Sequence, residues 1–63
     1  MKESLAIALK KAIEERNDKM IVSVAKKAFD NDIELEEICD ENSESFAIAA
    51  QAIGRSGWIP GIN

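Results

Sequence analysis

Histidine and tyrosine are absent from this 63-residue sequence, and cysteine, proline and tryptophan each occur once. The missing histidine removes the commonest general base and the commonest metal ligand of proteins. Cys39 has no second cysteine to pair with, and one thiol is too few for a structural zinc site. The sequence also lacks a glycine-rich phosphate loop. From these absences we expect a protein that is not an enzyme and that holds no metal and no cofactor.

Long hydrophobic runs are missing too, because no apolar stretch approaches the roughly 18 residues that mark a membrane span. The first residues do not begin a secretory signal, so with its unpaired thiol the protein is expected to be cytoplasmic and to have no membrane segment. A chain of 63 residues forms one domain and buries only about 60% of the surface that its unfolded form exposes. Its stability must therefore come from close helix packing, self-association or a partner.

Apolar residues recur at helical spacing along most of the chain, which predicts an all-α fold, a small bundle of three to four short helices. Leu5, Leu9 and Ile13 share one face of the first helix, and Asn17–Asp18 breaks the pattern and supplies an N-cap for the second. The second helix is apolar around most of its circumference, which predicts a central position. The third should start at a cap formed by Asn31. The helices are expected at residues 4–16, 19–29, 33–41 and 44–53.

The fourth helix is expected to bury one face and to end at a glycine. Its inner face is predicted to carry apolar residues at i, i+3, i+4 and i+7, namely Phe46, Ala49, Ala50 and Ile53. Gly54 would end the helix, so a helical domain over residues 1–54 is followed by an apolar C-terminal arm over residues 55–63. The arm is expected to pack either on the domain or on a partner. It can do both if Trp58 points inward to the domain and residues 59–62 point outward to the partner.

Negative charge is concentrated between residues 30 and 44. The acidic residues of this segment are Asp30, Asp32, Glu34, Glu36, Glu37, Asp40, Glu41 and Glu44, and no basic residue interrupts them. Outside the segment, eight basic residues face four acidic ones. The segment is interpreted either as a solvated helix face or as a docking surface for a basic partner. A calcium loop of the EF-hand kind is disfavoured, because Leu35 stands where the loop requires glycine.

A helix, a short turn, Leu35–Glu36–Glu37–Ile38 and a following helix resemble the helix-turn-helix of bacterial DNA-binding regulators. The resemblance covers residues 35–53 and implies a helix pair whose second member enters the major groove. That second helix, residues 43–53, contains no lysine or arginine, and Gln51 is its one side chain suited to reading bases. Nucleic acid is therefore not the expected partner.

The leading hypothesis is a small acidic, non-catalytic protein-binding module, an adaptor or inhibitor of a larger protein of the kind that phages and mobile elements encode. Its partner would present a basic surface. The residues expected to bind this partner are Glu34, Glu37, Asp40, Glu41, Glu44, Trp58, Ile59, Pro60 and Ile62. One alternative is a dimeric regulator that contacts DNA through Lys10, Lys11, Lys19, Lys26 and Lys27. A second alternative is a self-assembling structural protein, because residues 1–29 are net positive and residues 30–63 are net negative.

Overall fold

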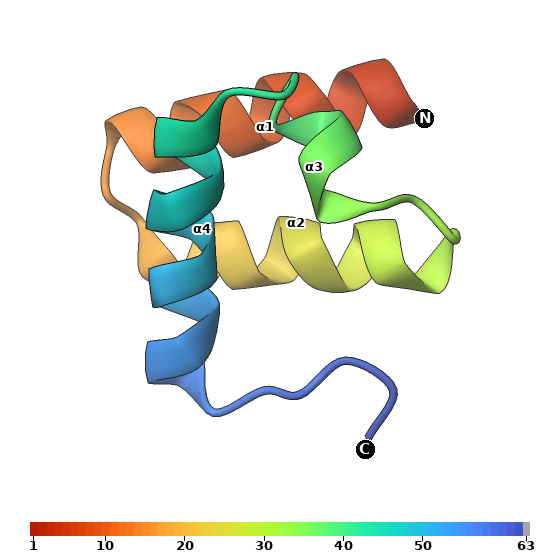
Figure 1. The fold of residues 1–63 in the computed structure, drawn as a ribbon, viewed down its shortest axis with the longest axis vertical. Helices are drawn as coiled ribbons and strands as arrows, with labels where there is room; N and C mark the ends of the chain where they lie inside the picture. Colours follow the sequence, from red (N-terminus) through yellow and green to blue (C-terminus); the bar gives the residue numbers. More distant parts are fainter. Residues whose placement is uncertain (63) are drawn as a thin grey trace.

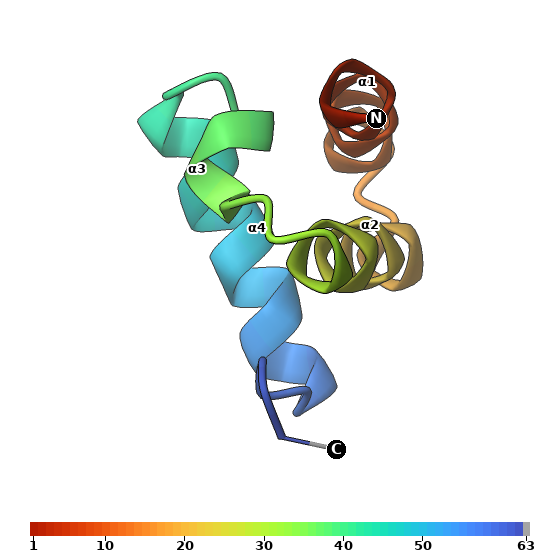
Figure 2. The same cartoon turned by 90° about the vertical axis from the view of Figure 1, so that its right-hand side faces the viewer.

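Four helices make up the fold in the computed structural model, which describes residues 1–62. They are α1 (Lys2–Glu14), α2 (Asp18–Asp30), α3 (Leu35–Ile38) and α4 (Ser43–Ser56). The all-α prediction is confirmed, since the described residues contain no strand and only one isolated bridge, between Ile59 and Ile62. Helices α1 and α2 run antiparallel, and α4 lies across both of them, with α3 leading into its start (Figure 1). In the view rotated by 90°, α1 and α2 are seen end-on beside α4 (Figure 2).

Helix α2 contacts each of the other three helices, as its broad apolar surface predicted. Ile21 on α2 and Leu9 on α1 are the largest fully buried side chains, at 0% and 1% exposure. Not all of the apolar surface of α2 is used, however. Met20 and Phe29, at its two ends, are about half exposed.

Local hydrogen bonds set the boundary between α1 and α2. The Asn17 side-chain oxygen accepts from the backbone N–H of Met20 at 3.1 Å, so the predicted N-cap is confirmed. Before it, Arg16 adopts left-handed backbone with φ 53°. That conformation breaks the helix, and α1 therefore ends at Glu14, two residues earlier than expected.

Helix α3 is one turn long, much shorter than the predicted helix over residues 33–41. Its N-cap is Glu34 and not Asn31, and Glu37 Oε1 accepts from the backbone N–H of Glu34 at 2.9 Å.

Left-handed backbone bounds α3 on both sides, with φ 58° at Asp32 before the helix and φ 56° and 57° at Asp40 and Glu41 after it. Acidic side chains at the negative end of a helix disfavour its extension, which agrees with the early stop.

The predicted inner face of α4 is correct for Ala49, which is buried, and for Ile53, which is partly buried, but the predicted end of the helix is wrong. The helix buries Ala49 and Ala52, whereas Phe46 is 38% exposed and Ala50 is exposed. It also continues through Gly54 to Ser56, and Gly57 takes the left-handed cap position with φ 79°. A glycine inside a helix costs only about 1 kcal/mol relative to alanine. Packing of the last turn against α2 offsets that cost.

Candidate docking grooves

Trp58 follows the cap of α4 and lies on the exposed side of α2. Its ring meets Phe29 edge to face, with 6.2 Å between ring centroids and an interplanar angle of 82°. The Lys26 Nζ lies 5.8 Å from the centroid of the same ring. Trp58 is half-buried and stands outside the main core cluster. Both contacts tie the segment after α4 to the C-terminal half of α2.

Residues Ile59 to Ile62 form a tight turn. The Ile62 N–H donates to the Ile59 carbonyl at 3.1 Å, with Pro60 second in the turn and Gly61 third. Gly61 has φ 85°, the positive value that a type II turn requires at its third residue. The turn leaves Ile59 57% and Ile62 65% exposed. Both side chains line a hollow of about 370 Å³ together with Lys26, Ser56, Gly57 and Trp58.

One groove brings the predicted acidic and apolar residues together. It has a volume of about 350 Å³ and is lined by Ala25, Phe29, Asp32, Ile33, Glu34, Leu35, Ile53, Trp58 and Pro60. We call it the tail groove. Two carboxylates, Asp32 and Glu34, thus share a concave surface with two aromatic rings and four aliphatic side chains. Of the residues expected to bind a partner, Glu34, Trp58 and Pro60 meet here.

The remaining predicted acidic residues lie elsewhere. Glu37 pairs with Lys2 across α1 and α3, with 3.7 Å between Oε2 and Nζ. Glu37 and Asp40 line a different groove of about 440 Å³ along α1. Glu41 and Glu44 are exposed and line neither groove. The structure therefore divides the acidic segment among several surfaces.

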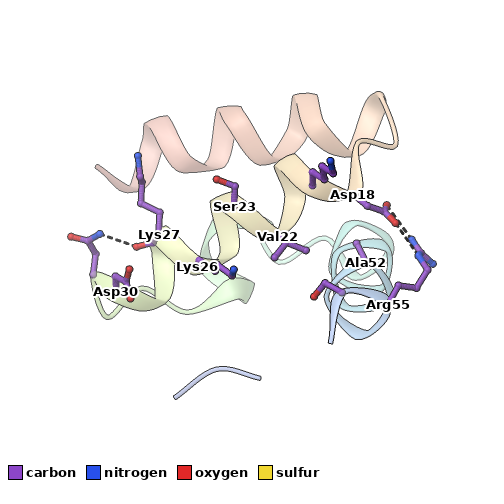
Figure 3. A pocket seen from close by; sticks show the side chains of 11 residues that line it. Asp18, Val22, Ser23, Lys26, Lys27, Asp30, Ala52 and Arg55 are labelled. Carbon is purple, nitrogen blue, oxygen red and sulfur yellow. Dashed lines mark hydrogen bonds and ion pairs between the residues drawn. The ribbon is translucent and has the colours of Figure 1, made fainter. Parts of the chain in front are cut away.

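The largest groove, of about 770 Å³, lies between α2 and the last turn of α4 (Figure 3). It is lined by Asp18, Lys19, Val22, Ser23, Lys26, Lys27, Asp30, Asn31, Ala52, Arg55 and Ser56. We call it the basic groove, because four of these side chains are cationic and two are anionic. The polar stripe along α2 was readable from the sequence. The part played by Arg55 and Ser56 was missed, because the helix was expected to end before them.

The five lysines proposed to contact DNA do not share this surface. Lys19, Lys26 and Lys27 line the basic groove, whereas Lys10 lines the groove along α1 together with Glu37 and Asp40. The phosphates of a DNA strand lying along α2 would thus contact only some of the five lysines. This distribution gives the DNA-binding alternative less support than the sequence suggested.

An ion pair closes one end of the basic groove. Arg55 donates through Nε to Asp18 Oδ2 at 2.9 Å and through Nη2 to Asp18 Oδ1 at 3.2 Å (Figure 3). This hydrogen bonding, together with the positive charge of Arg55, lowers the pKa of the Asp18 carboxyl. The same hydrogen bonding, together with the negative charge of Asp18, raises the pKa of Arg55. Arg55 is therefore neutralised within the chain.

Cys39 is buried beneath α3 at 5% exposure, and burial raises the pKa of its thiol, with the nearby charge of Glu36 adding to the effect. A buried thiol of raised pKa is a poor nucleophile. Within residues 1–62, no three cysteine, aspartate or glutamate side chains gather where they could hold a metal ion. No helix of the same residues is long and apolar enough to cross a membrane.

Comparisons of the chain with protein-family models, with curated proteins and with solved structures find no match. Function must therefore be inferred from the grooves themselves. The tail groove and the basic groove carry opposite charge.

Proposed function

We propose that this protein is a non-catalytic protein-binding module, an adaptor or inhibitor that holds a basic, partly apolar segment of a partner protein in the tail groove. The observation that carries the proposal is the meeting of Asp32 and Glu34 with Trp58 and Phe29 around one concave surface. Aromatic side chains dominate binding energy where a partner buries them, and carboxylates beside them select a basic partner.

The charge of the tail groove is available to a partner. Neither Asp32 nor Glu34 takes part in an ion pair within the described part of the chain, and both are exposed. A lysine or arginine of a partner would meet these carboxylates directly. An exposed ion pair contributes only about 0–1 kcal/mol, so the charges orient the partner more than they hold it.

Affinity must then come from the apolar part of the groove. Ile33, Leu35 and Ile53 are each partly buried, so a bound side chain would complete their burial. Removing apolar surface from water contributes about 25 cal/mol per Å². The volume of about 350 Å³ is at the lower end of the range for ligand pockets, which favours a short segment over a folded domain. Ile59 and Ile62 line a separate hollow, which shares Trp58 with the tail groove and offers further exposed apolar surface.

The acidic residues outside the groove act at longer range. Glu37, Asp40, Glu41 and Glu44 lie on other surfaces of the chain and add to its net negative charge, which speeds the encounter with a basic partner. We propose that these residues increase the rate at which the partner associates and contribute little to the stability of the complex. With its buried thiol, the module is assigned to the cytoplasm.

The test is selection of ligands from a library of random peptides displayed on phage, with the immobilised protein as bait. Selected peptides should combine lysine or arginine with leucine, isoleucine or phenylalanine. They should bind the Asp32→Asn/Glu34→Gln variant about tenfold more weakly, since two charge contacts of about 0.7 kcal/mol each are lost. Lys10→Gln/Lys11→Gln serves as the matched control and should bind as the unaltered protein does. Peptides without basic residues, or equal binding to the groove variant, would contradict the proposal.

A further inference from the structure

The basic groove is not used by the proposed partner contact, and its lysines are unpaired. Lys19, Lys26 and Lys27 form no ion pair within residues 1–62, whereas Arg55 is paired with Asp18. Seven or eight residues separate Lys19 from the other two, which corresponds to about 10–12 Å along the helix axis. Val22 and Ala52 add apolar lining. An extended acidic surface, and not a single small anion, fits cations spaced in this way.

Such an acidic surface is present on the chain itself. The connection between α3 and α4 carries Asp40 and Glu41, and Glu36 and Glu44 flank it on the two helices. All four side chains are exposed, and none takes part in an ion pair in the described residues. We call these four residues the acidic corner. It lies outside the tail groove and is therefore free when that groove is occupied.

The acidic corner and the basic groove lie at opposite ends of α4. The corner surrounds the start of α4 and includes Glu44 in its first turn, whereas the groove is lined by Arg55 and Ser56 in the last turn. The 14 residues of α4 span about 21 Å, so the corner cannot reach the groove of its own chain. Figure 1 shows the connection before α4 and the end of α4 on opposite sides of α2.

We propose that the basic groove binds the acidic corner of a second copy of this chain. Because the two surfaces differ and lie at opposite ends of one helix, the contact is head to tail and leaves one free groove and one free corner at the two ends of any open assembly. Such contacts generate rings or open chains and not only closed dimers. Self-association through this face leaves the tail groove open to a partner.

The net charge of −4 does not prevent this contact. The molecule measures 26 × 22 × 17 Å, and at physiological ionic strength charges are screened beyond about 8 Å. The attraction between the charges that meet at the contact therefore exceeds the repulsion between the more distant charges of the two copies. For the same reason the association must weaken as salt is added.

The experiment is sedimentation velocity of the full chain over a concentration series. The average mass should rise with concentration at about 50 mM salt, and the association constant should fall about tenfold or more by about 500 mM, where the screening length drops to a few ångström. Two charge-reversed variants test the surfaces: Lys19→Glu/Lys27→Glu in the groove and Asp40→Lys/Glu41→Lys at the corner. Each variant alone brings like charges together and should remain monomeric.

Mixing the two variants is the decisive step. Each corner then meets a groove of opposite charge, so association should return to about the level of the unaltered protein. Lys10→Glu/Lys11→Glu carries the same charge change away from the groove. It should self-associate normally. In a mixture with the corner variant the average mass should stay below that of the two-variant mixture, because the corner variant can then join only at one end of an assembly, through its unaltered groove. A monomeric unaltered protein at low salt, unchanged association of the groove variant, or no recovery in the mixture would each overturn the proposal.

Discussion

Asp18 and Arg55 join the first residue of α2 to the last turn of α4 through two hydrogen bonds, of 2.9 and 3.2 Å. The residues are 37 positions apart, and these two hydrogen bonds are the only ones found between side chains in residues 1–62. Each also suits its own helix end, with a carboxylate at the N-terminus of α2 and a cation near the C-terminus of α4. The pair thus fixes how α4 crosses α2 and closes the basic groove.

This pair predicts how stability depends on pH. The pKa of Asp18 is lowered in the folded state, so its contribution is fully present above the unfolded value of about 3.9 and is lost as pH falls through the lower folded value. Urea unfolding of the protein and of Asp18→Asn should therefore differ at neutral pH and converge in acid. In a double-mutant cycle with Arg55→Gln, the two losses should be less than additive. Strictly additive losses would contradict the coupling.

Left-handed backbone at Glu41 predicts a stabilising substitution. With φ 57°, the glutamate is held in a conformation that asparagine tolerates better. Glu41→Asn should raise the free energy of unfolding by about 0.5 kcal/mol. Glu44→Asn, in the first turn of α4, should lower it, because a favourable charge at a helix N-terminus is lost. The reverse order in urea unfolding would show that Glu41 is not strained.

Burial predicts opposite outcomes for two isoleucines. Ile21 is 0% exposed at the centre of α2, and its replacement by alanine should cost about 2–5 kcal/mol and leave a domain of this size largely unfolded. Ile7 is 71% exposed, and the same change there should stay within about 0.5 kcal/mol. Circular dichroism with thermal unfolding checks both. Similar losses at the two positions would contradict the packing of α2.

The contact between Phe29 and Trp58 predicts a spectroscopic change. Trp58 is the one tryptophan of the sequence, so its fluorescence reports on the segment after α4. Phe29→Ala should shift the emission of Trp58 to longer wavelength, because the ring loses its edge-to-face partner and meets more water. Far-ultraviolet circular dichroism should stay unchanged, since Phe29 is half exposed. Unaltered emission would mean that the two rings do not pack.

The sequence predicted those features of the fold that depend on neighbouring residues. Asn17 could be identified as a cap because its hydrogen bond to Met20 spans three residues. The sequence could not show which face of α4 is turned toward the core, because alanines at several adjacent positions make two faces of the helix nearly equal in hydrophobicity. The early end of α3, at Ile38, could not be predicted for a different reason. Its left-handed residues, Asp40 and Glu41, are of types common in helices and turns alike.

The candidate sites were predictable only in part. Glu34 and Trp58 were both expected to bind a partner, yet nothing local indicates that they share a groove, since the folding of α3 and α4 onto α2 brings them together. Phe29 was assigned to the central helix and proves to be half exposed beside Trp58. The basic groove depends on Arg55 and Ser56, which the sequence placed beyond the helix. Tertiary contacts, and not residue types, define both grooves.

The central claim is that the tail groove binds a basic, partly apolar segment. Its most direct test is a titration of Trp58 fluorescence with a selected peptide, comparing the protein with Asp32→Asn/Glu34→Gln. A saturable change in emission, weakened about tenfold by the two substitutions, is the predicted result. Emission that does not change on binding, or an affinity that the substitutions leave unaltered, would show that the partner does not occupy this groove.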